Sequence, residues 1–271
     1  MLGAITGDIV GSRFEFNNYR RKDFELFAAG CQVTDDSIMT LAVAKALMEA
    51  AKLERLDDYS LVEQLAVKYM QEIGRKYPSC GYGGMFEEWV FSDEPKPYNS
   101  FGNGAAMRIS PVGFMAGTET EVIQLSKAVT GVTHNHPEGI KGAETVAVAV
   151  FMARQGCTKD EIRDRIDRFY YPLNFTIGEI RYTYEFNETC QETVPQAIQA
   201  FLESVSFEDA IRTAVSVGGD SDTLAAITGA VAEAYYGIPE DIKSKALTYL
   251  DDELRVIYDR WISFHAGYFT P

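Results

Sequence analysis

The chain has 271 residues, of which 46% are hydrophobic, so it is long enough to bury one large core or two small ones. Acidic residues outnumber Lys and Arg by 40 to 25, and the formal net charge of −15 argues against nucleic acid as a main partner, since such binding neutralises phosphates with basic side chains. The opening segment MLGAITGDIVGSRFEF has no basic n-region, and no segment reaches the roughly 20 apolar residues that span a bilayer. We therefore expect no signal peptide, no membrane association and a cytoplasmic location.

Apolar residues recur at helical spacing along most of the chain. Helices that are apolar on nearly all sides, as enclosed helices are, are predicted at 38–51, 143–154 and 224–236. Amphipathic helices are predicted in chain order at 60–73, 121–130, 159–169, 194–204, 207–215 and 240–263. The best strand-like alternation, at 179–186, lies in an irregular stretch between helices. We predict an all-α fold and, because no linker or shift in composition divides the chain, a single domain over residues 1–271.

Two of the enclosed helices begin with clusters of acidic and hydroxyl residues. These residues are Thr34, Asp35 and Asp36 in VTDDS, and Asp220, Asp222 and Thr223 in GGDSDT. Helix capping explains either cluster alone, because Asp and Ser are favoured N-caps and first-turn acids gain about 0.3–1 kcal/mol from the helix dipole. Capping needs only one short polar side chain, however, and four buried carboxylates without a nearby Lys or Arg need compensating charge. Two divalent cations would supply it, and hard oxygen ligands favour Mg²⁺ or Mn²⁺ over zinc.

Three further segments carry candidate site residues. In SFGNG, Gly102 and Gly104 could let backbone N–H groups approach an anion, although GNG is also an ordinary turn. In THNHPEG, His134 could contact a ligand, bind a metal or have a structural role. Glu15 stands between two phenylalanines that could raise its pKa and make it a proton donor or acceptor; the alternative is a solvated acid.

Taken together and in this order, the segments GDIVGSRFE, TDDS, GNGAAMRISPVG, THNHPEG and GGDSDTLAAITGAVAEAYYG resemble the ADP-ribosylglycohydrolase family, to which dinitrogenase reductase-activating glycohydrolase and J1 crystallin are related. The resemblance covers nearly the whole chain. It implies a compact all-α enzyme with a central cleft for two magnesium or manganese ions. Such an enzyme hydrolyses the bond between C1″ of ADP-ribose and an acceptor, and its substrate is an ADP-ribosylated protein or a small ADP-ribose conjugate.

The resemblance also assigns roles to individual residues. The metal ligands that it implies are Thr34, Asp35, Asp36, Asp220, Asp222 and Thr223. The catalytic residues that it implies are Glu15, Asp35 and Asp36. The substrate-binding residues that it implies are Ser100, Phe101, Gly102, Asn103, Gly104 and His134.

Two alternatives to a glycohydrolase stay open at this stage. The chain could bind ADP-ribose as a reader without turnover, or it could be a dinuclear-metal phosphohydrolase, since clustered aspartates also serve phosphoester cleavage. The acceptor is open as well: it could be an arginine nitrogen, a serine oxygen, a nucleobase or a small metabolite.

Overall fold

Helices are the only regular secondary structure in residues 1–268, the part of the chain that the computed structural model describes. In chain order they are α1 (Leu2–Gly11), α2 (Asp35–Lys52), α3 (Tyr59–Gly74), α4 (Gly84–Phe91), α5 (Gly104–Met107), α6 (Ser110–Met115), α7 (Glu119–Gly131), α8 (Pro137–Arg154), α9 (Lys159–Phe169), α10 (Ile177–Ile180), α11 (Cys190–Glu203), α12 (Phe207–Val215), α13 (Ser221–Tyr236), α14 (Glu240–Leu247) and α15 (Asp252–Tyr268). The predicted all-α fold is confirmed. Over these residues, no helix has both the length and the apolar character needed to cross a bilayer.

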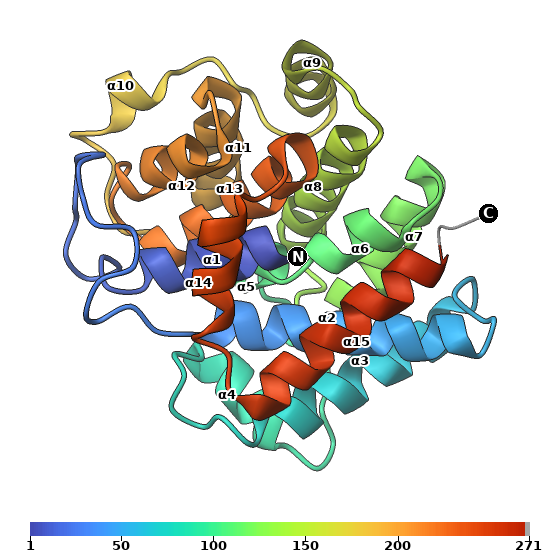
Figure 1. The fold of residues 1–271 in the computed structure, drawn as a ribbon. Coiled ribbons are helices and arrows are strands. Elements are labelled where there is room, and N and C mark those ends of the chain that lie inside the picture. The colour runs from blue at the N-terminus through green and yellow to red at the C-terminus, as the bar shows by residue number, and fades with distance from the viewer. Residues whose placement is uncertain (269–271) are drawn as a thin grey trace.

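The three helices predicted to be enclosed are α2, α8 and α13, and they form the centre of the molecule. On α13 every residue from 221 to 232 is buried, because α1, α8, α11 and α12 pack around it. On the other side of the molecule, α3 and α15 cover α2 (Figure 1). The acidic starts of α2 and α13 therefore lie at the ends of buried helices.

Helix α1 was not predicted, yet all ten of its residues are buried. Its glycines recur every fourth residue and face α13, so the two backbones touch. A Cβ atom on Gly3 would lie 2.1 Å from the carbonyl oxygen of Gly229, and one on Gly7 would lie 2.0 Å from that of Ala225. At Gly11 it would lie 2.5 Å from the Cα atom of Asp222. Only glycine permits this approach, and it brings the residues of α1 beside the acidic start of α13.

Two segments differ from their predicted form. The amphipathic pattern at 240–263 is not one helix: α14 ends at Leu247, and the Asp251 carboxylate accepts a hydrogen bond from Leu254 N (2.9 Å) and so starts α15 separately. The strand-like alternation at 179–186 forms no strand. Its buried ring, Tyr184, donates its hydroxyl hydrogen to the Glu192 carbonyl on α11 (2.7 Å), so the segment is fixed to a helix instead of a neighbouring strand.

Candidate metal and active site

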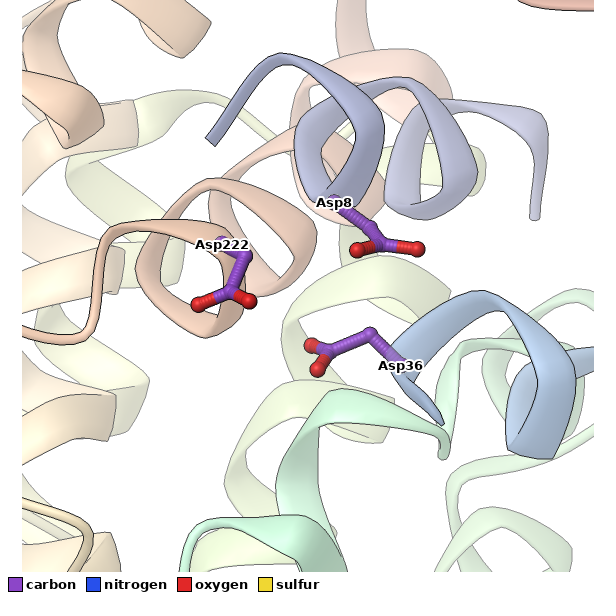
Figure 2. Close-up of side chains that lie close together, drawn as sticks. All are labelled: Asp8, Asp36 and Asp222. Carbon is purple, nitrogen blue, oxygen red and sulfur yellow. The ribbon is translucent and has the colours of Figure 1, made fainter. Parts of the chain in front are cut away.

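Three buried carboxylates from three different helices point toward one another. They belong to Asp8 on α1, Asp36 on α2 and Asp222 on α13 (Figure 2). One oxygen from each lies within 4.8 Å of the other two. Glu15, Asp220 and Asp222 form a second group with the same spacing. Because Asp222 belongs to both groups, the five acids make one continuous cluster.

The helix starts do not use these side chains as caps. Thr34 is the N-cap residue of α2 and Asp220 that of α13, but neither side chain accepts a hydrogen bond from its helix. The Thr34 hydroxyl instead donates to Asp8 Oδ1 (2.6 Å), and Asp220 Oδ2 accepts from the side-chain amide of Asn103 (2.6 Å). Capping therefore does not explain the Thr34 and Asp220 side chains, whose hydrogen bonds are made within the cluster and to the SFGNG loop.

Asp8 is a site residue that the sequence analysis missed. Its carboxylate accepts hydrogen bonds from the backbone N–H groups of Thr34 (3.1 Å) and Ser37 (3.2 Å) and from the hydroxyl groups of both. These bonds fix the first turn of α2 against α1, so Asp8 orients Asp36 as well as contributing an oxygen. The signal in the sequence was an acid within the apolar, glycine-spaced segment GAITGDIVG, where a buried charge needs partners.

The cluster carries negative charge that the protein does not neutralise. Within residues 1–268 no basic group forms an ion pair with any of its acids. Burial raises the pKa of Asp8 to about 6, against the opposing effect of the Ser37 and Thr34 hydrogen bonds. Burial first, and then the neighbouring acids, raise the pKa values of Asp36 and Asp222 well above the usual range.

The cluster fits a divalent cation. Asp36 Oδ1 is buried and has no hydrogen-bond partner, and buried polar atoms without partners are rare in folded proteins. Asp36 Oδ2 has only a 3.3 Å contact from the Thr223 hydroxyl. Hard oxygen atoms that converge and carry excess negative charge are what Mg²⁺ and Mn²⁺ bind.

Asp35 stands beside the cluster instead of inside it. It is partly exposed, and its Oδ1 atom is turned toward Gly81, where an added Cβ would lie 3.0 Å away. Its pKa is raised to about 8, mainly by burial and then by the charge of Asp8. Asp35 and Asp36 thus face different directions, as expected for adjacent residues in a first helical turn.

Glu15 reaches the cluster from the loop between α1 and α2. Burial first, and then the charge of Asp220, raise its pKa to about 7. Of the two flanking phenylalanines, Phe14 is buried, whereas Phe16 is 84% exposed and stacks on Phe186 with ring centroids 6.0 Å apart. An exposed aromatic pair therefore stands next to the acid.

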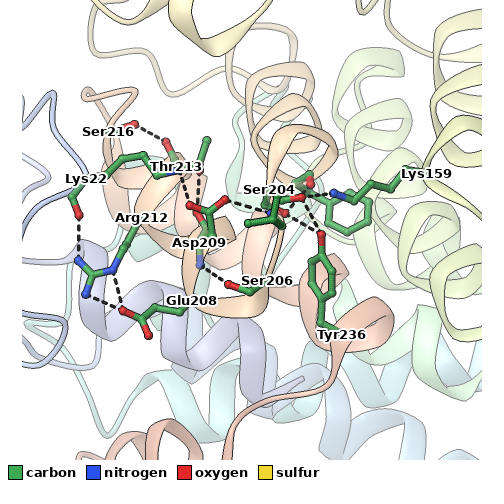
Figure 3. Close-up of polar contacts among 12 residues, drawn as sticks. Lys22, Lys159, Ser204, Ser206, Glu208, Asp209, Arg212, Thr213, Ser216 and Tyr236 are labelled. Carbon is green, nitrogen blue, oxygen red and sulfur yellow. Dashed lines mark hydrogen bonds and ion pairs between the residues drawn. The ribbon is translucent and has the colours of Figure 1, made fainter.

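Helix α12 and the turn before α13 hold this loop in place. Arg212 on α12 donates to the carbonyl oxygen of Lys22 (2.9 Å) and to the Glu208 carboxylate (Figure 3). It also donates to the carbonyl oxygen of Phe24 (2.6 Å). Asn18 Oδ1 accepts from Gly219 N (2.9 Å), one residue before Asp220. The loop position is thus tied directly to the second group of acids.

The SFGNG loop adjoins the cluster through Asn103, whose side-chain amide contacts Asp220. Two of the backbone N–H groups predicted to cradle an anion are already used: Gly102 N donates to Ser100 Oγ (3.1 Å) and Asn103 N to the Glu188 carbonyl (2.7 Å). Phe101 is 43% exposed, and its ring centroid lies 5.2 Å from that of His136. To a ligand, the loop therefore presents an exposed aromatic ring and small residues, whereas two of its amides already have partners.

His134 lies behind the same loop. An added Cβ on Gly102 or Gly104 would lie 3.6 Å or 3.4 Å from its Nε2 atom. Because both residues are glycines, no side chain from the loop contacts Nε2 at these two positions. A turn would not by itself need glycine at both. Every residue predicted for the site thus lies in the carboxylate cluster, beside it, on the adjoining loop or at the histidine behind that loop.

The fold and site define an all-α protein with a buried carboxylate cluster at the start of two central helices. The chain belongs to the ADP-ribosylglycohydrolase family, whose model matches residues 1–266. The family predicted from the motifs, a family of enzymes, is thereby confirmed.

Individual relatives agree with this assignment. The chain is 25% identical to ADP-ribosylhydrolase ARH3 of Xenopus tropicalis, covering 93% of this chain and 91% of the relative. It is 26% identical to ADP-ribosylarginine hydrolase Tri1 of Pseudomonas putida (strain GB-1), covering 88% and 70%. A solved structure described as an ADP-ribosylglycohydrolase-related protein complex has the same fold, with a TM-score of 0.65 at 21% identity over 98% of this chain and 96% of the other.

Proposed function

We propose that this protein is a metal-dependent ADP-ribosylhydrolase that cleaves the C1″ glycosidic bond between ADP-ribose and an acceptor on a protein or small molecule. The observation that carries the proposal is the two sets of three acids that share Asp222, the first of which includes the Asp36 oxygen without a hydrogen-bond partner. The names of the relatives, ADP-ribosylhydrolase ARH3 and ADP-ribosylarginine hydrolase Tri1, support the same chemistry.

The acids and hydroxyls of the cluster would hold two ions, Mg²⁺ or Mn²⁺. The proposed ligands are the predicted residues Thr34, Asp35, Asp36, Asp220, Asp222 and Thr223, together with Asp8. When bound, such ions supply positive charge for the ribose hydroxyls and lower the pKa of a coordinated water. We propose two ions because the acids form two sets of three that share Asp222, and each set offers enough oxygen ligands to hold one ion.

The chain's own residues would divide the remaining work. Glu15 lies with Asp220 and Asp222, where it can hold or pass a proton between the attacking water and the departing acceptor atom. The ADP part would lie over the SFGNG loop and His134. The exposed stack of Phe16 on Phe186 adjoins Glu15, so we place the acceptor against this pair.

The test is product identification. Arginine-linked and serine-linked ADP-ribosyl peptides are incubated with the protein in Mg²⁺, in Mn²⁺ and in chelator. The proposal expects free ADP-ribose with an intact diphosphate from at least one peptide, only when metal is present. Release of AMP or phosphate would instead identify a phosphohydrolase, and tight ADP-ribose binding without turnover would identify a reader. The Asp241→Asn variant, which neutralises an exposed acid on α14, is the matched control and should keep full activity.

A further inference from the structure

Arg108 is a buried cation without an acidic partner. It follows α5, is 1% exposed, and forms no ion pair with any acid in residues 1–268. Burial lowers the pKa of its guanidinium only to about 10, so it keeps its charge at neutral pH. Burying an unpaired charge is costly, and the groups that compensate the guanidinium are uncharged: the face of the Phe86 ring (5.0 Å), one hydroxyl and a ring nitrogen of His134. Because such a buried charge does not stabilise the fold, we expect Arg108 to have a role in the site.

The hydroxyl belongs to Thr133, and it links Arg108 to His134. Arg108 Nη2 donates to Thr133 Oγ1 (2.6 Å), and the same oxygen lies 2.8 Å from His134 Nδ1. Since a guanidinium only donates, the threonine oxygen must accept from it, and its own hydrogen is free for His134. The other acceptor within reach, the carbonyl oxygen of Thr130, is farther away at 3.3 Å.

A second donor faces the same ring nitrogen. Arg108 Nη2 itself lies 3.5 Å from His134 Nδ1, and this group cannot accept a hydrogen bond. A hydrogen on Nδ1 would point at the Arg108 donor, whereas an unprotonated Nδ1 can accept from both Arg108 and Thr133. The ring is also neutral at physiological pH, because burial and the nearby charge of Arg108 lower its pKa well below the usual value. A neutral ring whose Nδ1 accepts carries its hydrogen on Nε2.

The Nε2 end of the ring faces the SFGNG loop. Within residues 1–268 no protein atom forms a hydrogen bond with it, and any side chain on Gly102 or Gly104 would cover it. Two backbone amides of the loop already donate to protein oxygens, whereas Nε2 is available to a ligand. His134 is 5% exposed, and its Nε2 atom lies against the loop to which we assign the ADP part of the substrate.

We propose that Arg108 and Thr133 are positioning residues that fix His134 as the Nε2–H tautomer, so that it donates a hydrogen bond to an oxygen atom of the substrate, a ribose hydroxyl or a phosphate. In this form His134 is neither a metal ligand nor a base, because one nitrogen is occupied and the other is protonated. The identity of the ligand rests on the proposed function, whereas the tautomer does not.

The tautomer is measured directly by long-range ¹H–¹⁵N spectroscopy of the side chains of the free protein near pH 7. The chain has 3 histidines, and the His134→Gln variant identifies the signal. We expect an unprotonated Nδ1 and a protonated Nε2 in the wild type. A protonated Nδ1, or a charged ring, would overturn the proposal.

Variants test the two positioning residues. Thr133→Val and Arg108→Met should move both ¹⁵N shifts toward the average of the two tautomers and lower ADP-ribose affinity about tenfold, the effect of roughly one lost hydrogen bond. Thr133→Ser should restore both readouts. Thr130→Val is the matched control, since it removes a buried hydroxyl without partners from α7 and should change neither readout.

The outcomes separate this proposal from the proposed function. If Thr133→Val weakens binding but leaves the tautomer unchanged, Thr133 is merely structural and the proposal is wrong. If the wild type has the expected tautomer but binds no ADP-ribose, the proposed function fails while the positioning role of Arg108 and Thr133 stands. Should Arg108→Met not fold, the two Thr133 variants still decide the question.

Discussion

Gly7 is the point where α1 rests on the backbone of α13, and replacing it with alanine tests whether this contact builds the site. The new Cβ would lie 2.0 Å from the Ala225 carbonyl oxygen, and the other nearest atoms are backbone atoms as well. Ordinary van der Waals contact begins at 3.4 Å, so the methyl group would lie 1.4 Å too close. No side chain can rotate away to make room, and the two helices must separate.

The expected consequences are a loss of stability and a larger loss of metal affinity. Overpacking of a core costs about 1–3 kcal/mol, which for a chain of this size lowers Tm by roughly 2–12 °C. The same displacement moves Asp8 away from Asp222, and metal sites tolerate only about 0.2 Å of error in ligand distance. We expect Mn²⁺ affinity to fall at least tenfold, even at temperatures where the variant stays folded.

Calorimetric titration with Mn²⁺ and thermal unfolding in chelator measure the two effects separately. Gly83→Ala is the control, because Gly83 has φ of −61° and nothing lies within 4 Å of an added Cβ there. If Gly7→Ala bound Mn²⁺ as tightly as the wild type, the packing of α1 on α13 would not determine the geometry of the cluster.

Three other predictions concern the site itself. Asp8→Asn should weaken Mn²⁺ binding about 10–100-fold, because an amide cannot accept all four hydrogen bonds from Thr34 and Ser37; unchanged affinity in calorimetry would remove Asp8 from the site. In chelator, the free energy of unfolding should fall as pH rises from about 4 to 8: the raised pKa values of Asp8 (about 6) and Asp35 (about 8) mean that the folded state binds more protons than the unfolded state in this window. Thermal scans should show this trend and its loss on adding Mg²⁺, whereas greater stability at pH 8 than at pH 5 in chelator would contradict it. Phe16→Ala should lower kcat/KM for ADP-ribosyl peptides several-fold but leave the Kd for free ADP-ribose unchanged, since free ADP-ribose has no acceptor; an equal loss for both ligands would show that Phe16 does not contact the acceptor.

The parts of the site that lie within short segments could be predicted from the sequence. Asp35, Asp36, Asp220 and Asp222 attract notice because too many acids precede helices that are too apolar to lie on the surface. Glu15 could be singled out by its apolar neighbours. In each case the evidence is local, and the structure places all these residues in or beside the cluster.

The parts that depend on partners distant in the sequence could not be predicted in the same way. Helix α1 is short and rich in glycine, which has low helix propensity, and its spacing has meaning only once α13 is known to lie against it. Asp8 lies on this helix and was not predicted for the same reason. The contact of Asn103 with Asp220 and the link from Arg108 to His134 depend on side-chain directions that no periodicity specifies.

The central claim is that residues 34–36 and 220–223, remote in the chain, meet around two divalent cations. Anomalous diffraction from crystals grown with Mn²⁺ tests it most directly, with the Asp222→Asn variant beside the wild type. We expect two peaks in the wild type, one next to Asp36 and one next to Asp220, with Asp222 in contact with both, and the loss of at least one peak in the variant. An absence of peaks in the wild-type cluster, or two unchanged peaks in the variant, would contradict it.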